Sequence, residues 1–265
     1  MITKQDYRQL DWGNIKSGGS IGMLSKTIIT RGGKNYYVKI SAYNKHHGVY
    51  GIESLSEVIA SRLAKIMKIP CINMKLVDAL ITKDDNTFRT YLCVSPDYKK
   101  AGETVVPFED DYELNALDKE TPLEYVKRLG ITESIYSMFI FDYVIANLDR
   151  HGANIELYEE IKIMAPLFDN GNSLYATRDE KEISQPDFYI GDDNMGNNYV
   201  GSRSLLDNIK SIDKVVDLGR LTKEHRAVLF KDLGNVVSKK RRDAIWNLII
   251  RRYLNARKIC NFKEV

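Results

Sequence analysis

The sequence predicts an α+β fold with two lobes: a small, mainly antiparallel β lobe with one helix, followed by a mainly helical lobe. Short alternating segments rich in β-branched residues, bounded by Gly, Asn and Asp turns, dominate the first part of the chain. Apolar residues at helical spacing dominate the rest. The 265 residues are enough for two lobes that share a cleft. A charged, turn-rich segment follows residue 97, so we predict lobes at residues 1–98 and 99–265.

Composition describes an ordinary globular chain, with 43% apolar and 28% charged residues. The net charge of +3 is too small to indicate a polyanionic partner. Cys71, Cys93 and Cys260 are widely spaced without a metal or redox pattern, which suits a reducing compartment. The sequence shows no signal-like segment and no long apolar run. We therefore predict a cytoplasmic protein without a membrane partner, although signal-independent secretion stays open.

A Gly/Ser-rich loop precedes the first clear strand. Residues Lys16–Lys26 (KSGGSIGMLSK) lead into the β-branched segment Thr27–Thr30. Successive backbone N–H groups of such a loop can surround an anion. Most loops of this composition are only hairpin turns, and that alternative remains. If this loop binds phosphate, the contacts are assigned to Ser17, Gly18, Gly19, Ser20 and Gly22.

A lysine within a strand and a glutamate on the next helix form the second candidate feature. The alternating strand Asn35–Ser41 carries Lys39, and the amphipathic helix Glu53–Met67 follows. In protein kinases a strand lysine pairs the α- and β-phosphates and is held by a helix glutamate. Glu57 is a candidate for this partner, with Glu53 as the alternative. A glutamate favoured only by the helix dipole would be the interpretation if the lysine stood alone.

Two more strands are expected at Cys71–Ile81 and Arg89–Val94, on either side of an Asp/Asn turn. We expect Tyr91–Val94 to be the edge strand that leads into a hinge between the lobes. The backbone there would contact the adenine edge of a nucleotide, and we assign this contact to Leu92 and Val94.

The segment Asn147–Ser173 (NLDRHGANIELYEEIKIMAPLFDNGNS) carries the strongest functional pattern. It places Asp149, His151 and Asn154 within six residues and adds Asp169 in a D-x-G motif. Mg²⁺ prefers carboxylate oxygens and substrate phosphates, and protein kinases use D-x-x-x-x-N followed by D-x-G. The pattern assigns the first Asp to the acceptor hydroxyl, the Asn and second Asp to Mg²⁺, and the His to the γ-phosphate. An Asn/Asp-rich surface loop is the alternative.

The flanking residues predict a buried helix at Ser134–Ala146 and a short strand at Ile161–Phe168. Further helices are predicted at Leu123–Leu129, Ser202–Val216, Thr222–Val237 and Lys239–Ile259. The Asp/Asn/Gly run at residues 191–198 is expected to be a solvated loop in the position of an activation segment. The last helix is basic, but a solvated face opposite a packed stripe explains this, so we expect no direct nucleic-acid binding.

The motifs N-L-D-R-H-G-A-N and A-P-L-F-D-N-G-N-S-L resemble those of HipA-like serine/threonine kinases, especially short single-chain members related to the cell-translocating kinase of Helicobacter. The resemblance implies a protein-kinase-like fold, ATP and Mg²⁺ as cofactors, and phosphoryl transfer to a protein hydroxyl. Its catalytic residues would be Lys39, Glu57, Asp149 and His151, with Asn154 and Asp169 as metal ligands. It also implies autophosphorylation near the glycine loop, for which the candidates are Ser17, Ser20 and Ser25.

The resemblance further implies partners. The substrate would be a protein such as a translation component, and the regulator would be a helix-turn-helix antitoxin. The glycine loop starts near residue 17, so we expect the extra N-terminal subdomain of the longest members to be missing. Two alternatives remain: a small-molecule or lipid kinase of the same plan, and a catalytically inactive nucleotide-binding scaffold.

Overall fold

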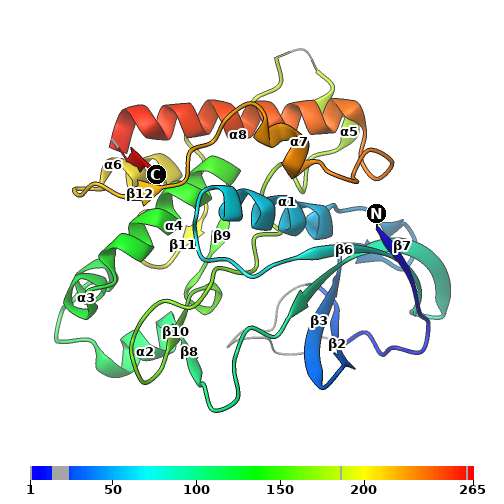
Figure 1. The fold of residues 1–265 in the computed structure, drawn as a ribbon, viewed down its shortest axis with the longest axis horizontal. Helices are drawn as coiled ribbons and strands as arrows, with labels where there is room; N and C mark the ends of the chain where they lie inside the picture. The colour runs from blue at the N-terminus through cyan, green and yellow to red at the C-terminus, as the bar shows by residue number, and fades with distance from the viewer. Residues whose placement is uncertain (1, 14–23, 186, 261) are drawn as a thin grey trace.

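The computed structural model describes residues 2–13, 24–185, 187–260 and 262–265, and it has the α+β architecture that the sequence predicts (Figure 1). A five-stranded sheet has the order β1–β6–β7–β3–β2. All neighbouring pairs are antiparallel except β1 with β6. Its strands are β1 (Thr3–Tyr7), β2 (Lys26–Arg31), β3 (Lys34–Ile40), β6 (Lys75–Lys83) and β7 (Asn86–Pro96).

Turn chemistry fixes the register of the hairpin β2–β3. Gly32 and Gly33 have φ angles of +56° and +72°, the left-handed values that a tight hairpin turn requires and that glycine adopts without penalty. The resulting register places Lys26 opposite Lys39. Two lysines far from the turn are therefore neighbours across the sheet.

The prediction of an edge strand at Tyr91–Val94 is wrong, because β7 pairs with β6 on one side and with β3 on the other. Leu92 packs in a small core on the outer face of the sheet, and Cys93 packs against the large core on the inner face. An apolar run buried on both faces is typical of a central strand. The edge strands of this sheet are β1 and β2.

Helix α1 (Glu53–Ile66) lies between the sheet and the C-terminal helices (Figure 1). It contacts β6 and β7 on one side and α7 on another. Most of its residues are buried although its first turn is polar. A helix that packs on two sides is apolar over most of its surface, so α1 joins both lobes through one continuous core.

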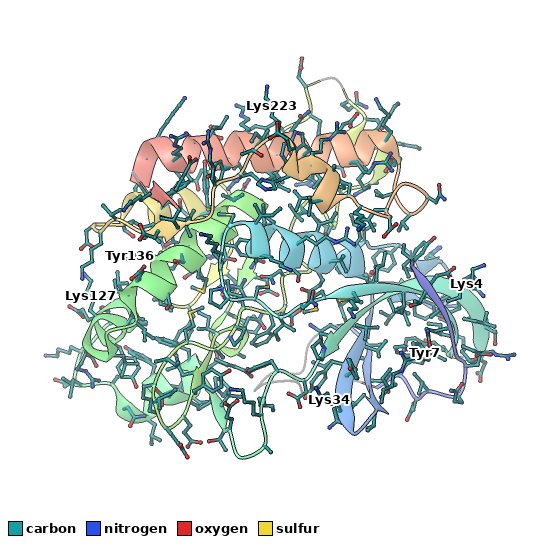
Figure 2. The ribbon with its side chains drawn as sticks, viewed as in Figure 1. Lys4, Tyr7, Lys34, Lys127, Tyr136 and Lys223 are labelled. Carbon is teal, nitrogen blue, oxygen red and sulfur yellow. The ribbon has the colours of Figure 1, made fainter. Side chains whose placement is uncertain are left out.

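The helical lobe is built around α4, whose predicted position at Ser134–Ala146 is confirmed almost to the residue. It is buried on nearly every side and packs against α6 and α8. Figure 2 shows Tyr136 on α4 and Lys127 on the neighbouring α3. Asp213, after α6, accepts a hydrogen bond from Tyr136 and lies 3.9 Å from the amine of Lys127. The helices are α2 (Phe108–Asn115), α3 (Pro122–Leu129), α4 (Thr132–Ile145), α5 (Glu180–Ile183), α6 (Leu205–Lys210), α7 (His225–Leu229) and α8 (Lys239–Cys260).

Three predicted elements are shorter than expected or absent. The helices predicted at Ser202–Val216 and Thr222–Val237 shrink to α6 and α7. The second breaks before Asp232, whose φ of +63° is not helical. Ile161–Phe168 is not a strand: Met164 and Leu167 form only isolated bridges, and the proline between them cannot donate to a ladder. The turn-rich boundary segment contains β8 and α2, and a division after residue 98 stays a prediction.

Short strand pairs and one 3₁₀ helix complete the fold. Two of these pairs, β8–β10 and β9–β11, fix the loops around the candidate site. Among the described residues, no helix is long and apolar enough to cross a membrane. The short elements are β4 (Tyr43–Asn44), β5 (Gly48–Val49), β8 (Val105–Pro107), β9 (Asp149–Arg150), η1 (Gly152–Asn154), β10 (Glu156–Tyr158), β11 (Asn197–Asn198), β12 (Asp217–Leu218) and β13 (Lys263–Glu264).

Candidate active site

Three charged side chains from β3, α1 and the D-x-G loop meet where the two lobes face each other. The Nζ atom of Lys39 lies 3.3 Å from Oε1 of Glu57 and 3.1 Å from Oδ1 of Asp169. The amine and the second carboxylate are 130 positions apart in the chain. The predicted lysine–glutamate ion pair therefore forms, and the D-x-G aspartate joins it.

Burial and charge act against each other in this cluster. Burial favours the neutral amine of Lys39, but Asp169 and Glu57 outweigh it and raise the lysine pKa above its ordinary value. Burial would also raise the pKa of Asp169, but the lysine charge and hydrogen bond hold it below the ordinary value. For Glu57 burial prevails, and its pKa is raised. The aspartate is thus the carboxylate held most firmly in its charged form.

The backbone fixes this arrangement from the acidic side. The Asn170 N–H donates to Oε2 of Glu57 at 3.0 Å, so the glutamate bridges the lysine and the loop. Asp169 has a φ of +54°, a left-handed value that is uncommon outside glycine and tends to occur at functional loops. Glu53, the alternative partner, instead accepts from the N–H of Ala42 at 3.0 Å.

The D-x-x-x-x-N loop leaves one polar atom without a partner. Asn154, on η1, donates through Nδ2 to the carbonyl of Asp149 at 2.9 Å. Its Oδ1 is buried and accepts no hydrogen bond from the described residues, and the residue is only 2% exposed. A buried acceptor without a donor is rare and needs an explanation. Oxygen ligation of Mg²⁺ would satisfy it, and Asp169 on the adjoining loop supplies a carboxylate of the kind Mg²⁺ prefers.

Asp149 and His151 lie on the same loop and are partly exposed. Within the described part of the chain, neither side chain takes part in a hydrogen bond or ion pair. Strand β11 pairs in parallel with β9 and puts Asn197 beside Asp149. The run at residues 191–198, predicted to be a solvated loop, therefore ends in a strand that borders the candidate catalytic aspartate.

A buried arginine that the motif analysis passed over holds the two loops together. Arg150 is fully buried and donates to both carboxylate oxygens of Asp142 on α4, at 3.0 and 2.9 Å. It also donates to the carbonyl oxygens of Asn154 and Phe168 and to Oδ1 of Asn170. Burial alone would lower the pKa of this guanidinium, but the aspartate raises it. An acidic residue within the apolar stretch of α4, Asp142, was the signal that could have revealed it.

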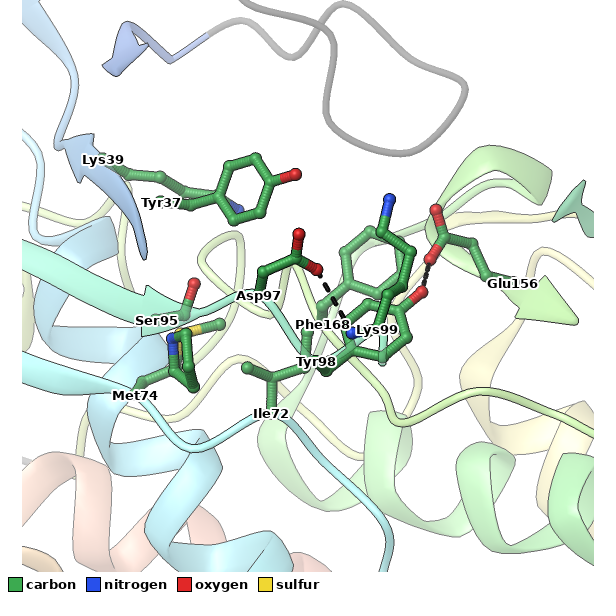
Figure 3. Close-up of a pocket in the computed structure, with 11 residues that line it drawn as sticks. Tyr37, Lys39, Ile72, Met74, Ser95, Asp97, Tyr98, Lys99, Glu156 and Phe168 are labelled. Atoms are coloured by element: carbon green, nitrogen blue, oxygen red, sulfur yellow. Dashed lines mark hydrogen bonds between the residues drawn. The ribbon is translucent and has the colours of Figure 1, made fainter. Parts of the chain in front are cut away.

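A pocket opens beside Lys39, and Figure 3 shows the side chains that line it. Leu92 and Val94, to which adenine contacts were assigned, are not among them; both pack in the outer core of the sheet. The chain immediately after them does reach the pocket. The lining residues are Tyr37, Lys39, Ile72, Met74, Ser95, Pro96, Asp97, Tyr98, Lys99, Glu156 and Phe168.

Lys26 is a second lysine that the sequence analysis did not assign to the site. It is 2% exposed and lies opposite Lys39 in the β2–β3 register. Burial lowers its pKa, the neighbouring lysine lowers it further, and Asp169 partly opposes the shift. Strand alternation counted back from the glycine turn was the signal that could have revealed this pairing.

The glycine-loop assignments cannot be placed. Ser17, Gly18, Gly19, Ser20 and Gly22 lie outside the described residues. Ser25, the remaining candidate for autophosphorylation, directly precedes β2 and is partly buried. Its carbonyl accepts the N–H of Ile40 at 3.1 Å.

Comparisons with known proteins bear on the fold. No family model and no curated protein matches the sequence. The crystal structure of the Helicobacter pylori proinflammatory kinase CtkA matches with a TM-score of 0.64 and 14% identity, over 97% of this chain and 99% of CtkA. The chain has a protein-kinase-like fold. HipA of Shewanella oneidensis MR-1, solved with HipB and operator DNA, has a TM-score of 0.46 and 12% identity, over 91% of this chain and 65% of HipA.

The match to CtkA confirms the predicted α+β fold with a small, mainly antiparallel lobe and a helical lobe. A Helicobacter kinase is also the kind of neighbour that the two sequence motifs predicted. At this identity the likeness concerns the kinase-like fold alone. The argument for function therefore depends on the geometry of this chain's own side chains.

Proposed function

We propose that this protein is an ATP- and Mg²⁺-dependent kinase that phosphorylates a protein serine or threonine. The observation that carries the proposal is the position of Lys39 between Glu57 and Asp169, at 3.3 and 3.1 Å. A strand lysine held by a helix glutamate next to a metal-binding aspartate is the arrangement that protein kinases use around the triphosphate. A scaffold protein without catalytic activity would have no need to keep all three.

The roles follow from the chemistry of each side chain. Lys39 would contact the α- and β-phosphates, and Glu57 would keep its amine in place. Asp149 would orient the acceptor hydroxyl and take up its proton, for which its partly exposed carboxylate is suited. His151, two residues further along the loop, would contact the γ-phosphate. Most of the rate enhancement would come from positioning and charge neutralisation.

The residues also suit the proposed cofactors. Asn154 Oδ1 and the Asp169 carboxylate would hold Mg²⁺, which neutralises phosphate charge when bound. Among the described residues no group of three or more His, Cys, Asp or Glu side chains is suited to a metal. A metal held by one carboxylate, one amide and substrate phosphates agrees with this and with the preferences of Mg²⁺.

The test is transfer of labelled γ-phosphate by the purified protein, with Mg²⁺ or with excess chelator. We expect Mg²⁺-dependent transfer that Asp149→Asn reduces by about 10²- to 10⁴-fold, the usual contribution of a positioned base, while ATP binding persists. Asp169→Ala should instead lose the Mg²⁺ dependence of ATP binding. Wild-type transfer rates in Asp149→Asn would contradict the assignment of roles.

The acceptor and the regulator stay proposals that come from the sequence motifs. A panel of protein, aminoglycoside and phosphoinositide substrates separates a protein kinase from a kinase of the same plan that acts on small molecules or lipids. Mass spectrometry after incubation with ATP tests modification of Ser17, Ser20 and Ser25. A helix-turn-helix regulator would be sought as a protein that binds the kinase and suppresses its transfer activity.

A further inference from the structure

A buried carboxylate lies in the candidate nucleotide pocket without an ion-pair partner among the described residues, although Lys99 lines the same pocket. Glu156 begins β10, two positions after Asn154, and it is 4% exposed. No lysine, arginine or histidine among the described residues lies within ion-pair distance of it. Its Oε2 accepts a hydrogen bond from the hydroxyl of Tyr98, and no residue of the described chain donates to its Oε1 (Figure 3).

A buried carboxylate such as Glu156 destabilises the fold unless other interactions offset the loss of its hydration. Burying an ionised carboxylate costs free energy when it is not paired and hydrogen-bonded. Most buried carboxylates are paired with a cation, and this one instead lines the pocket beside Lys39. The position of this one therefore points to a ligand rather than to stability.

The surroundings of Glu156 define what it can recognise. The pocket wall near it includes the apolar side chains of Ile72, Met74 and Phe168. A few polar groups in a mostly apolar pocket usually fix the orientation of the ligand. The ionised carboxylate can only accept hydrogen bonds, so its counterpart must be an N–H or O–H donor.

We propose that Glu156, oriented by Tyr98, selects the nucleotide by accepting a hydrogen bond from a donor on its nucleoside part. This inference rests on the proposed function, since it takes the pocket beside Lys39 to be the nucleotide site. The donor is either the 6-amino group of adenine or a ribose hydroxyl, which present the same chemistry to a carboxylate. This role of Glu156 replaces the assignment of base recognition to Leu92 and Val94, which lie outside the pocket lining.

Selectivity follows from the cost of an unmet acceptor. An analogue that lacks the donor would fill the pocket and still leave Oε1 of Glu156 without a hydrogen bond, which sites built around a hydrogen bond penalise strongly. Hydrogen bonds to charged groups are strong enough to change affinity by about 10- to 100-fold. The discrimination should vanish when the carboxylate is removed, because analogue and natural ligand then lose the same contact.

The experiment measures binding of ADP, IDP and 2′-deoxy-ADP with Mg²⁺ by titration calorimetry. IDP lacks the 6-amino group, and 2′-deoxy-ADP lacks one ribose hydroxyl. For the wild type we expect one analogue to bind about 10- to 100-fold more weakly than ADP, and its identity names the donor. Glu156→Leu should reduce that gap to less than about 3-fold, and Tyr98→Phe should reduce it in part.

Glu159→Gln is the matched control, since it removes an exposed carboxylate three positions away and should keep the gap. If Glu156→Leu does not fold, Glu156→Gln, which keeps a neutral acceptor, should give an intermediate gap. If the Glu156 variants lose the same affinity for all three ligands, so that the difference between ADP and the weaker analogue stays as in the wild type, the inference alone is overturned. A wild-type protein that binds none of the three would overturn it together with the proposed function.

Discussion

Two buried ion clusters share the segment Phe168–Asn170, and they differ in how completely their donors are satisfied. The guanidinium of Arg150 has five N–H groups, and all five donate to Asp142 or to the two loops. The amine of Lys39 has three N–H groups but only two partners, Glu57 and Asp169, among the described residues.

The two clusters also differ in how much of their side chains solvent can reach. Arg150 has no solvent exposure, and its aspartate partner lies within the apolar helix α4. Lys39 lines the pocket, and the side chain of Asp169 is 28% exposed. Asn170 belongs to both clusters, since its N–H binds Glu57 and its side chain binds Arg150. We call the cluster of Arg150 and Asp142 the saturated cluster, and the cluster of Lys39, Glu57 and Asp169 the unsaturated cluster. We infer that the saturated cluster holds the loop while the unsaturated cluster stays able to bind a ligand.

Breaking the saturated cluster should produce the largest effect. Arg150→Met leaves Asp142 buried without its cation, and removal of one partner of a buried pair typically costs about 3–5 kcal/mol. We expect that loss in the free energy of unfolding, measured by urea denaturation. The double variant Asp142→Leu/Arg150→Met should recover part of it, because no charge is left unpaired. A loss below about 1 kcal/mol in the single variant would contradict a holding role.

Breaking the unsaturated cluster should affect catalysis more than stability. Lys39→Met removes a cation aimed at phosphate, and loss of one such electrostatic contact typically lowers turnover by about 10²- to 10³-fold. The loss in unfolding free energy should be smaller than for Arg150→Met, since Glu57 can take up a proton in response. Lys75→Met, on the exposed start of β6, is the control. Equal destabilisation by both variants would erase the distinction between the clusters.

The sequence predicted the unsaturated cluster better than the saturated one. Lys39, Glu57 and Asp169 belong to a recurring motif, and Lys39 and Glu57 also lie in elements whose period is clear. Arg150 occupies an unspecified position inside that motif, and its partner Asp142 is an isolated acidic residue in the apolar part of α4. Local patterns do not show which distant carboxylate a buried arginine will meet, because packing of the whole lobe decides it.

The fold shows the same limit. Long elements with a strong period, α1, α4 and α8, lie where the sequence placed them. Short elements that depend on tertiary pairing could not be predicted from the sequence. For example, β9 and β11 are two residues each, and each is a strand only because it pairs with the other. The pocket lining could not be predicted from local sequence either. Leu92 and Val94 were assigned to adenine contacts, but they pack in the outer core of the sheet.

The pH dependence offers a smaller test of the unsaturated cluster. The pKa of Glu57 is raised above its ordinary value of 4.5, so its contribution to stability is fully present below pH 4.5 and is lost as pH rises through the folded-state pKa. Glu57→Gln cannot ionise and avoids that loss. We expect its unfolding free energy, relative to wild type, to improve from pH 4 to pH 7. A difference that is constant over this range would contradict the raised pKa.

The contribution of Asp169 to stability has the opposite pH dependence, and it changes at lower pH. The pKa of Asp169 is held below 3.8, so its contribution is present above that pH and is lost as pH falls through the lower folded-state value. Asp169 is present in both the wild type and Glu57→Gln, and above about pH 5 it is ionised in both the folded and unfolded states, so it adds little slope to their difference. The relative improvement of Glu57→Gln in this window can therefore be ascribed to the glutamate.

The ion pair of Arg128 with Glu120 lies nearer the surface than the two buried clusters, and we expect it to make the smallest contribution to the free energy of unfolding. Arg128 on α3 contacts Glu120 at 2.7 Å, and its hydrogen bond lowers the pKa of that glutamate to about 2. By linkage, the contribution of Glu120 to stability is present above pH 4.5 and is lost as pH falls toward 2. Because water and salt screen exposed pairs, the contribution itself should be small. Arg128→Met should raise the pKa of the glutamate toward its ordinary value, measured by carboxyl NMR titration, with little change in unfolding free energy. A destabilisation comparable to that of Arg150→Met would show that burial does not determine how much an ion pair contributes in this fold, and the contrast between the two clusters would then need another explanation.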